Sequence, residues 1–243
     1  MRTNTVEHSI LKSLILHLLP GLLIGICYFA LAPLVKANGF PSIMALILAG
    51  IFVLIPFEFG FILLQSKKTG EKLINGIIKY CKPIPKWQYL VWVPIIFVLS
   101  GILFTLFEFT TEHLHVLFNR IPSNMNLDMG LSTEFSKQNL VVTYVLFLIF
   151  IVLILPVIEE FYFRGYLLPR MPAKLRGWSV PVHSGLFALY HTWTPWMFIT
   201  RAIGILPLIY IVKRKENIYL GIIAHCLLNS TDFILALIFL NNY

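Results

Sequence analysis

The sequence of 243 residues is poor in charge, because only 12% of its residues are charged whereas soluble domains average about 25%. So few charged side chains exclude a cytosolic globular enzyme, a nucleic-acid-binding protein and a disordered chain. Cysteine is also scarce. Cys27, Cys81 and Cys226 form no disulfide framework, and their spacing matches no metal-binding motif.

Apolar residues dominate instead, at 58% of the chain with a mean hydropathy of +0.82. A run of about 20 apolar residues is long enough to cross a bilayer. Seven candidate runs occur at 11–35, 41–65, 88–108, 139–163, 182–193, 195–212 and 217–240. The first run lacks a small-residue cleavage site and is too long for a removable signal peptide. The last run reads as one helix or as two, so we predict an all-α, polytopic transmembrane helix bundle of seven to eight spans.

The net charge of +8 indicates membrane topology, because Lys and Arg collect in cytoplasmic loops. Most of the 19 basic residues fall in segments that alternation of seven spans places on one side. These residues are Arg2, Lys12, Lys67, Lys68, Lys72, Lys79, Lys82, Lys86, Arg164, Arg170, Lys174, Arg176, Lys213, Arg214 and Lys215. We therefore expect an integral, multi-pass membrane protein with a cytoplasmic N-terminus. One membrane domain is expected overall: residues 1–138 form N-terminal helices with an irregular outer loop at 109–138, and residues 139–243 form a helical core that contains the polar residues considered next.

Two adjacent glutamates near the end of the fourth predicted span differ in their expected partners. An ionisable group at the centre of a membrane helix costs at least ~2.5–3.5 kcal/mol, so its presence indicates a function. Glu160 and Arg164 are four residues apart and share a helix face, where they can pair. Glu159 points 100° away from Glu160. We therefore predict that Glu159 is free to face a cavity.

Two histidines and an asparagine lie in later predicted spans. His225 and Asn229 share a helix face, as do Phe187 and His191, so that Phe187 can fill the turn beneath the imidazole. Peptide hydrolysis needs a base to activate water and donors for an oxyanion. A carboxylate with a neutral histidine suits the first task, and a histidine N–H with the Asn229 amide suits the second.

Three strings of this sequence have these spacings: Glu159-Glu160-Phe-Tyr-Phe-Arg164, Phe187-Ala-Leu-Tyr-His191 and His225-Cys-Leu-Leu-Asn229. In this order they resemble the EExxxR, FxxxH and HxxxN motifs of the CPBP intramembrane proteases, the CAAX prenyl endopeptidase and bacteriocin-processing group. The resemblance covers roughly residues 139–240. It implies a glutamate-dependent intramembrane endopeptidase with an eight-helix fold.

Roles for individual residues follow from the resemblance. It implies that Glu159 and His191 activate the water, that His225 and Asn229 hold the oxyanion, and that the remaining motif residues are supporting. An older interpretation of the family makes it metal-dependent, and Glu159, His191 and His225 would form a zinc-binding set of two histidines and one carboxylate. They lack the compact HExxH arrangement on one helix. On the family resemblance we favour no cofactor, with Zn²⁺ as the alternative.

Three further charged residues receive lesser roles. Asp232 follows His225 by seven residues, so it either orients that imidazole or caps a helix end. Glu58 either lines the cavity or pairs with a lysine at the cytoplasmic edge, and we favour the pair. Arg201 is expected to reach the outer membrane boundary rather than to bind substrate.

These features predict hydrolysis of a peptide bond in a membrane-associated protein or peptide, of the CAAX type or in bacteriocin or peptide processing. Pro181 in a first helical turn would start the fifth helix outside the hydrocarbon, so that the active site lies in the cytoplasmic half. The expected partners are this substrate and the lipid bilayer, with no nucleic acid. The alternatives are a catalytically silent scaffold or immunity protein and a polytopic transporter. We find no internal repeat of the kind common in transporters.

Overall fold

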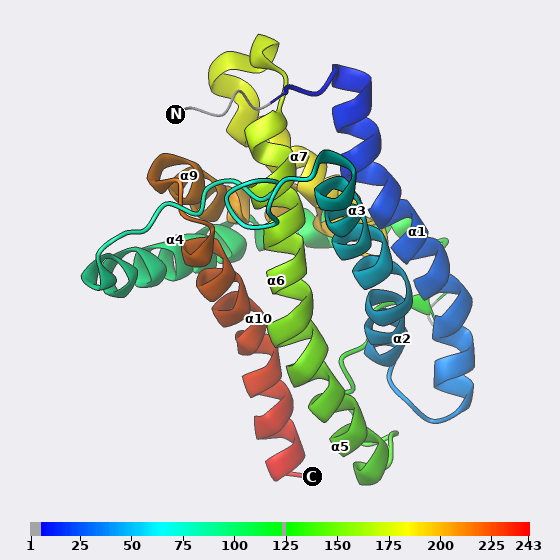
Figure 1. Cartoon of the computed structure of the whole chain (residues 1–243). Helices are drawn as coiled ribbons and strands as arrows, with labels where there is room; N and C mark the ends of the chain where they lie inside the picture. The colour runs from blue at the N-terminus through cyan, green and yellow to red at the C-terminus, as the bar shows by residue number, and fades with distance from the viewer. Residues whose placement is uncertain (1–5, 123–124) are drawn as a thin grey trace.

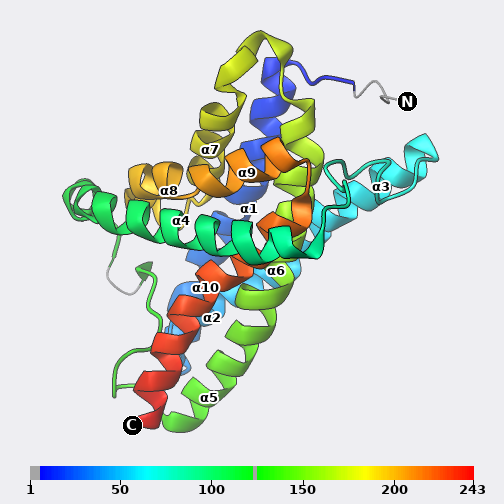
Figure 2. The ribbon, with the colours of Figure 1, turned by 90° about the vertical axis from the view of Figure 1, so that its left-hand side faces the viewer.

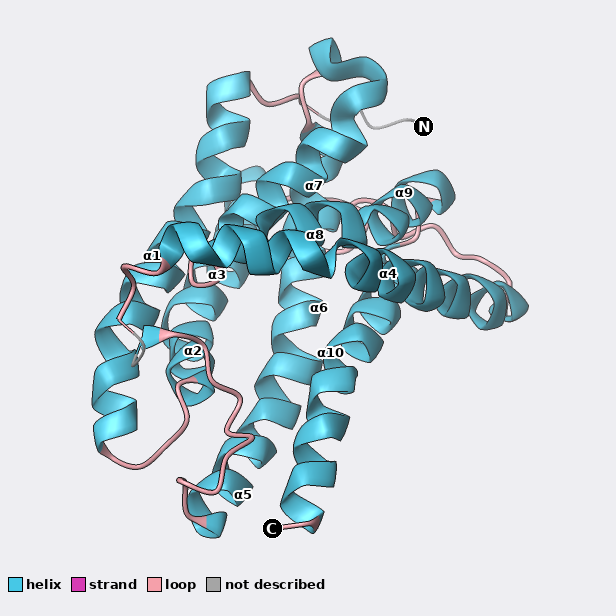
Figure 3. Ribbon diagram, turned by 180° about the vertical axis from the view of Figure 1, so that it is seen from behind, coloured by secondary structure: helices cyan, strands magenta, loops and turns pink. Residues whose placement is uncertain are grey.

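The computed structural model describes residues 6–122 and 125–243, which form helices joined by loops (Figures 1 and 3). No β-strand occurs in this part of the chain, and the predicted all-α class is confirmed. Arg2 and residues 123–124 of the predicted outer loop lie outside the described residues. The α-helices are α1 (Ile10–Ala37), α2 (Ile43–Ala49), α3 (Gly60–Thr69), α4 (Lys86–His115), α5 (Lys137–Leu146), α6 (Leu155–Glu159), α7 (Ser179–Tyr190), α8 (Phe198–Gly204), α9 (Leu206–Lys215) and α10 (Ile218–Asn241).

Polar caps fix where three of these helices begin. Ser9, Ser136 and Asn217 precede α1, α5 and α10, and the side chain of each accepts a hydrogen bond from the amide three residues later. Each cap satisfies one of the amides that lack a partner in the first helical turn. Mostly apolar sequence follows each cap. These three helices therefore begin where a polar cap meets a hydrophobic run.

A continuous helical segment through the middle of the molecule carries the adjacent glutamates (Figure 1). It runs over Lys137–Arg170 and consists of α5, π-helical turns at Phe147–Ile154, α6 and further π-helical turns at Glu160–Leu167. In Figure 1, α10 lies on one side of this segment and α1 with α2 on the other. The wide π-helical turns are frequent at functional sites. The segment therefore carries Glu159 and Glu160 between these helices.

The number of membrane-crossing helices differs from the prediction. Five helices of the described chain are long and apolar enough to cross a membrane, or six if the bent pair Pro195–Gly204 and Leu206–Lys215 forms one span. The predicted seven to eight spans are not confirmed. The run at 182–193 forms only the 12-residue α7, about 18 Å long. The run at 217–240 forms one unbroken helix.

The long helix α4 also departs from the expected bundle. It continues to His115 and lies across the other long helices (Figure 2). Hydropathy gives the length of an apolar segment but not the angle at which it packs. Strict alternation of parallel spans therefore does not describe this fold.

The basic segments that the sequence assigns to one side of the membrane meet in the structure. Backbone hydrogen bonds of 2.9 Å join His8 to Arg170, Lys79 to Gly165 and Lys82 to Glu216. The start of α1, the loop after α3, the end of the central helical segment and the end of α9 therefore lie together. This grouping agrees with the predicted charge distribution, because like-charged loops of a membrane protein gather on one side.

A glycine in α1 permits its contact with the end of α7. A Cβ added to Gly21 would lie 2.0 Å from the backbone oxygen of Tyr190, so we expect Gly21→Ala to destabilise the protein by roughly 1–3 kcal/mol through overpacking. Gly185→Ala is the matched control, since in the described chain no atom beyond its chain neighbours and its own helix backbone lies within 4 Å of a Cβ there. Thermal unfolding in detergent checks the prediction, and equal melting temperatures for both variants would contradict it.

Candidate active site

Glu159 and Glu160 lie at the end of α6 and are both buried, at 7% and 0% exposure. Oε1 of Glu160 lies 3.3 Å from a guanidinium nitrogen of the fully buried Arg164, in the i, i+4 arrangement that the spacing predicts. Glu159 instead lines a cavity. One carboxylate is therefore neutralised by an ion pair, and the other is available at the cavity wall.

A glycine brings α10 against the first of these carboxylates. A Cβ at Gly221 would lie 2.6 Å from Oε2 of Glu160, so only glycine fits here without a shift. One helical turn later, α10 presents His225 to the same two glutamates. The close approach of α10 and the central helical segment therefore positions this imidazole.

The ring of His225 lies between the two carboxylates. Its Nδ1 lies 3.0 Å from Oε1 of Glu160, and its Nε2 lies 3.8 Å from Oε2 of Glu159. Because an ionised carboxylate only accepts hydrogen bonds, Nδ1 donates to Glu160 and carries a proton. The Glu160 carboxylate thereby fixes the orientation of the ring, as carboxylates commonly do for functional histidines. This bond leaves Nε2 facing Glu159.

His191 follows the last residue of α7, where the backbone leaves the helix. Its Nδ1 lies 2.8 Å from the backbone oxygen of Phe187 and donates to it, since a carbonyl oxygen only accepts. In the neutral ring Nε2 is then unprotonated. The aromatic rings of Phe187, Tyr190 and Trp193 surround the imidazole, with ring centroids 4.8–5.0 Å away. His191 is therefore held as a hydrogen-bond acceptor at the cavity wall.

Phe187 packs as the spacing predicts. Its ring lies beneath His191 and 6.3 Å from the ring of His225. The guanidinium carbon of Arg164 lies 4.0 Å from its centroid, an attractive cation–π arrangement. The ring of Phe187 therefore packs against Arg164, His191 and His225 at the same time.

Asn229 lies one turn after His225 on α10 and also reaches the cavity. Its amide nitrogen donates to the backbone oxygen of Ile151 at 2.9 Å. That oxygen belongs to the first π-helical stretch of the central segment. Since a carboxamide has two N–H donors, one donor anchors the side chain and the second is left for a ligand.

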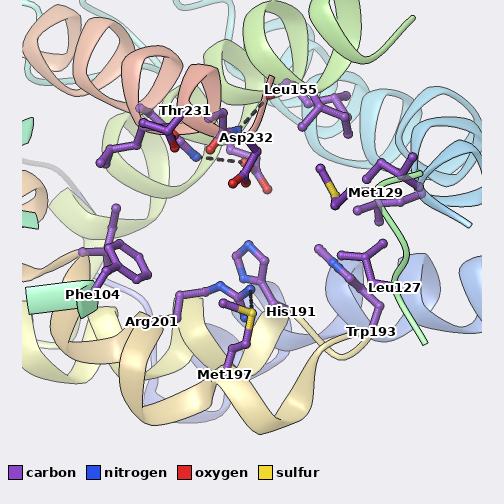
Figure 4. A pocket seen from close by; sticks show the side chains of 18 of the residues that line it. Phe104, Leu127, Met129, Leu155, His191, Trp193, Met197, Arg201, Thr231 and Asp232 are labelled. Carbon is purple, nitrogen blue, oxygen red and sulfur yellow. Dashed lines mark hydrogen bonds and ion pairs between the residues drawn. The ribbon is translucent and has the colours of Figure 1, made fainter. Parts of the chain in front are cut away.

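All four predicted catalytic side chains line one cavity of about 490 Å³. Glu159 enters it from α6, His191 from the end of α7, and His225 and Asn229 from α10. Figure 4 shows His191, Met197 and Arg201 on one side and Thr231 with Asp232 on the other. Most other lining residues are apolar, and they include residues of α1, α2 and α4, so both halves of the sequence build the walls. A carboxylate, two imidazoles and a carboxamide thus share a pocket within the size range of small-molecule sites.

The alternative zinc set is not assembled in this arrangement. Among residues 6–122 and 125–243, no group of three or more His, Cys, Asp or Glu side chains is arranged to hold a metal ion. Glu159 and His225 approach each other, but His191 completes no triad with them. These residues as placed do not fit a catalytic zinc ion, which needs three protein ligands around it.

The role predicted for Asp232 is wrong. The imidazole of His225 is instead oriented by Glu160, to which its Nδ1 donates. Seven residues along a helix separate two positions by about 10.5 Å, so the shared face does not bring them into contact. Asp232 does not cap a helix end either, because α10 continues to Asn241. It lines the cavity instead.

A third buried carboxylate lies beside the site, and the predicted lysine pair for it is wrong. Glu58 is 0% exposed, in the π-helical stretch Gly50–Phe59 between α2 and α3. It interacts electrostatically with Glu159 and Arg164 and adjoins the hydroxyl of Tyr190. Neither of its oxygens has a hydrogen-bond partner in the described structure. The sequence feature that could have identified Glu58 as a site residue is its place within an apolar run, because ionisable residues in membrane segments are typically functional.

The sequence did not predict that Arg201 lines the cavity. We expected it at the outer membrane boundary, but its half-buried side chain in α8 lines the cavity with His191 (Figure 4). The bend between α8 and α9 accounts for this difference, since the two helices meet at 43° and do not form a straight span.

Comparison with known proteins supports the resemblance that the motifs predict. Residues 141–231, less than half of the chain, match a family described as Rce1-like, type II CAAX prenyl endopeptidase. The matched region contains all three motifs and every predicted catalytic residue. No curated protein and no solved structure matches the chain.

Proposed function

We propose that the protein is an intramembrane endopeptidase that hydrolyses a peptide bond of a membrane-associated protein or peptide. The convergence of Glu159, His191, His225 and Asn229 on one cavity of an apolar helical protein carries this proposal. The match to Rce1-like CAAX prenyl endopeptidases supports a substrate with a prenylated cysteine near its C-terminus.

The first chemical step is attack by water. Glu159 accepts a proton from the water while the water oxygen attacks the scissile carbonyl carbon. His191 Nε2 accepts a hydrogen bond from the second O–H of the same water. The tetrahedral intermediate then collapses. The proton held by Glu159 passes to the amide nitrogen, the C–N bond breaks, and a carboxylic acid and an amine are released.

Amide and imidazole donors stabilise the intermediate. The second N–H of Asn229 is one donor for the oxyanion. Nε2 of His225 is the other, and it donates only when the ring carries both protons, since Nδ1 already donates to Glu160. Glu160 and Arg164 are therefore positioning residues, which hold the donor ring in place.

We further propose that the site opens towards the cytoplasm and that the N-terminus is cytoplasmic. The basic segments that meet at one face of the molecule support this orientation. Gly165 belongs to that junction and follows Glu159 by six residues, so the carboxylate lies within about 9 Å along the helix of the basic face.

Proteolysis in liposomes tests the proposed function. The reporter is a fluorogenic peptide with a prenylated cysteine followed by three C-terminal residues. We expect the wild-type protein to cleave it and His225→Ala to lose most of the rate, because His225 holds the oxyanion. Cleavage by His225→Ala at the wild-type rate would contradict the proposed mechanism.

Chelation separates the two mechanistic interpretations of the site. We expect cleavage of the reporter to persist after treatment with a strong chelator such as 1,10-phenanthroline, because the described residues do not assemble a metal site. The cleavage rate before and after treatment is the measurement. Loss of cleavage that added Zn²⁺ restores would instead assign Glu159, His191 and His225 as zinc ligands.

A further inference from the structure

The cavity contains the guanidinium group of Arg201, which pairs with no carboxylate among residues 6–122 and 125–243. Arg201 donates from one terminal nitrogen to Oγ1 of Thr194 at 3.1 Å and approaches Sδ of Met197 at 3.4 Å. Both partners are uncharged. The other terminal nitrogen is buried and makes no hydrogen bond with the part of the chain that the structure describes. No ion pair joins Arg201 to a carboxylate of the described residues.

Such a group is expected to have an anionic partner. A buried charge is costly unless it is paired, and the neutral contacts of Arg201 do not compensate its charge. The acidic side chains that line the cavity are Glu159 and Asp232. Glu159 interacts with Arg201 at a distance but faces His225 and serves as the base, and Asp232 lies across the cavity (Figure 4).

We propose that Arg201 binds a carboxylate of the substrate and thereby selects peptides that carry one close to the scissile bond. This inference rests on the proposed function. The planar guanidinium matches the two oxygens of a carboxylate. Because Arg201 and His191 lie on the same side of the cavity (Figure 4), the carboxylate lies near the attacked carbonyl. It is either the C-terminal carboxylate of the peptide or an acidic side chain of the segment after the cleaved bond.

Cleavage of matched reporter peptides tests this selection. One reporter has a free C-terminal carboxylate, the second is its C-terminal amide, and the third is the amide with one Glu among the three last residues. We expect amidation to lower kcat/KM of the wild-type protein about tenfold or more, as loss of a charge-assisted hydrogen bond does. Arg201→Gln should cleave the first two reporters at similarly low kcat/KM, mainly through a higher KM.

The third reporter identifies the source of the carboxylate. If kcat/KM recovered with the third reporter in the wild-type protein but not in Arg201→Gln, an acidic side chain of the peptide would be the group that Arg201 binds. If the wild-type protein cleaved the third reporter with a kcat/KM as low as that for the simple amide, the C-terminal carboxylate would be the group that Arg201 binds. Arg214→Gln is the control, since this exposed arginine of α9 does not line the cavity. We expect it to retain the wild-type preference for the first reporter.

Binding gives a readout that does not depend on catalysis. Fluorescence anisotropy measures the Kd of the three peptides for Glu159→Gln and for Glu159→Gln with Arg201→Gln. We expect a tenfold or larger preference for carboxylate-bearing peptides only where Arg201 is present. Equal Kd values for acid and amide peptides in both proteins would overturn the inference. Absence of cleavage by the wild-type protein, with this preference intact, would instead refute the proposed function alone.

Discussion

Glu159→Gln is expected to lower kcat for the reporter peptide by about 10²–10⁴-fold, the range typical of a lost general base. The amide has nearly the size and shape of the carboxylate, so the cavity wall is preserved while the proton acceptor is lost. Initial rates in liposomes at saturating peptide give the measurement. The expected loss is in kcat and not in KM, because Glu159 acts on the water and not on the bound peptide.

The control for this substitution is Glu134→Gln, an exposed glutamate outside the cavity. It makes the same change of charge, and we expect it to leave kcat unchanged. If Glu159→Gln retained wild-type turnover, Glu159 would not be the base. If the wild-type protein showed no proteolysis and Glu159→Gln still supported its function in cells, the protein would act as a scaffold.

Arg164→Leu is expected to destabilise the protein by about 3–5 kcal/mol, the cost typical of removing one partner of a buried ion pair. Arg164 and Glu160 are both 0% exposed, so the substitution leaves an uncompensated carboxylate in the core. It also removes the cation–π contact with Phe187. Thermal or denaturant unfolding in detergent micelles measures the change.

A double variant separates the ion pair from the loss of packing. Glu160→Gln with Arg164→Met removes both charges at similar volume, and we expect it to be more stable than Arg164→Leu. It should nevertheless cleave the reporter slowly, because a glutamine orients His225 less strongly than a carboxylate does. Stability of Arg164→Leu equal to that of the wild-type protein would refute a structural role for the ion pair.

Local spacing was the most reliable guide to the site. The pairing of Glu160 with Arg164 and the packing of Phe187 beneath His191 follow from a separation of four residues on one helix. Helical geometry determines such contacts before any tertiary packing. The same geometry failed for Asp232, because a shared face two turns away brings no contact.

Contacts between distant segments could not be predicted from the sequence. His225 bonds to Glu160 across 65 residues, and this contact determines which of its nitrogens faces Glu159. It depends on the close approach that Gly221 permits. No periodicity within one helix contains that information.

The depth of a charged residue was equally hard to infer. We favoured positions at the membrane boundaries for both Glu58 and Arg201, but Arg201 lines the cavity and Glu58 is buried beside Glu159. Hydropathy places a residue along an apolar run but says nothing of helices that bend or cross. The 43° break beside Arg201 and the transverse α4 are features of this kind.

A double-mutant cycle on Glu159 and His191 tests most directly whether both side chains act on one water molecule. The measurement is kcat for Glu159→Gln, for His191→Ala and for the double variant with the same reporter. Residues that act as a unit give non-additive losses, so we expect the double variant to be little slower than the slower single variant. Losses that multiply, or a wild-type rate for His191→Ala, would contradict a shared catalytic water.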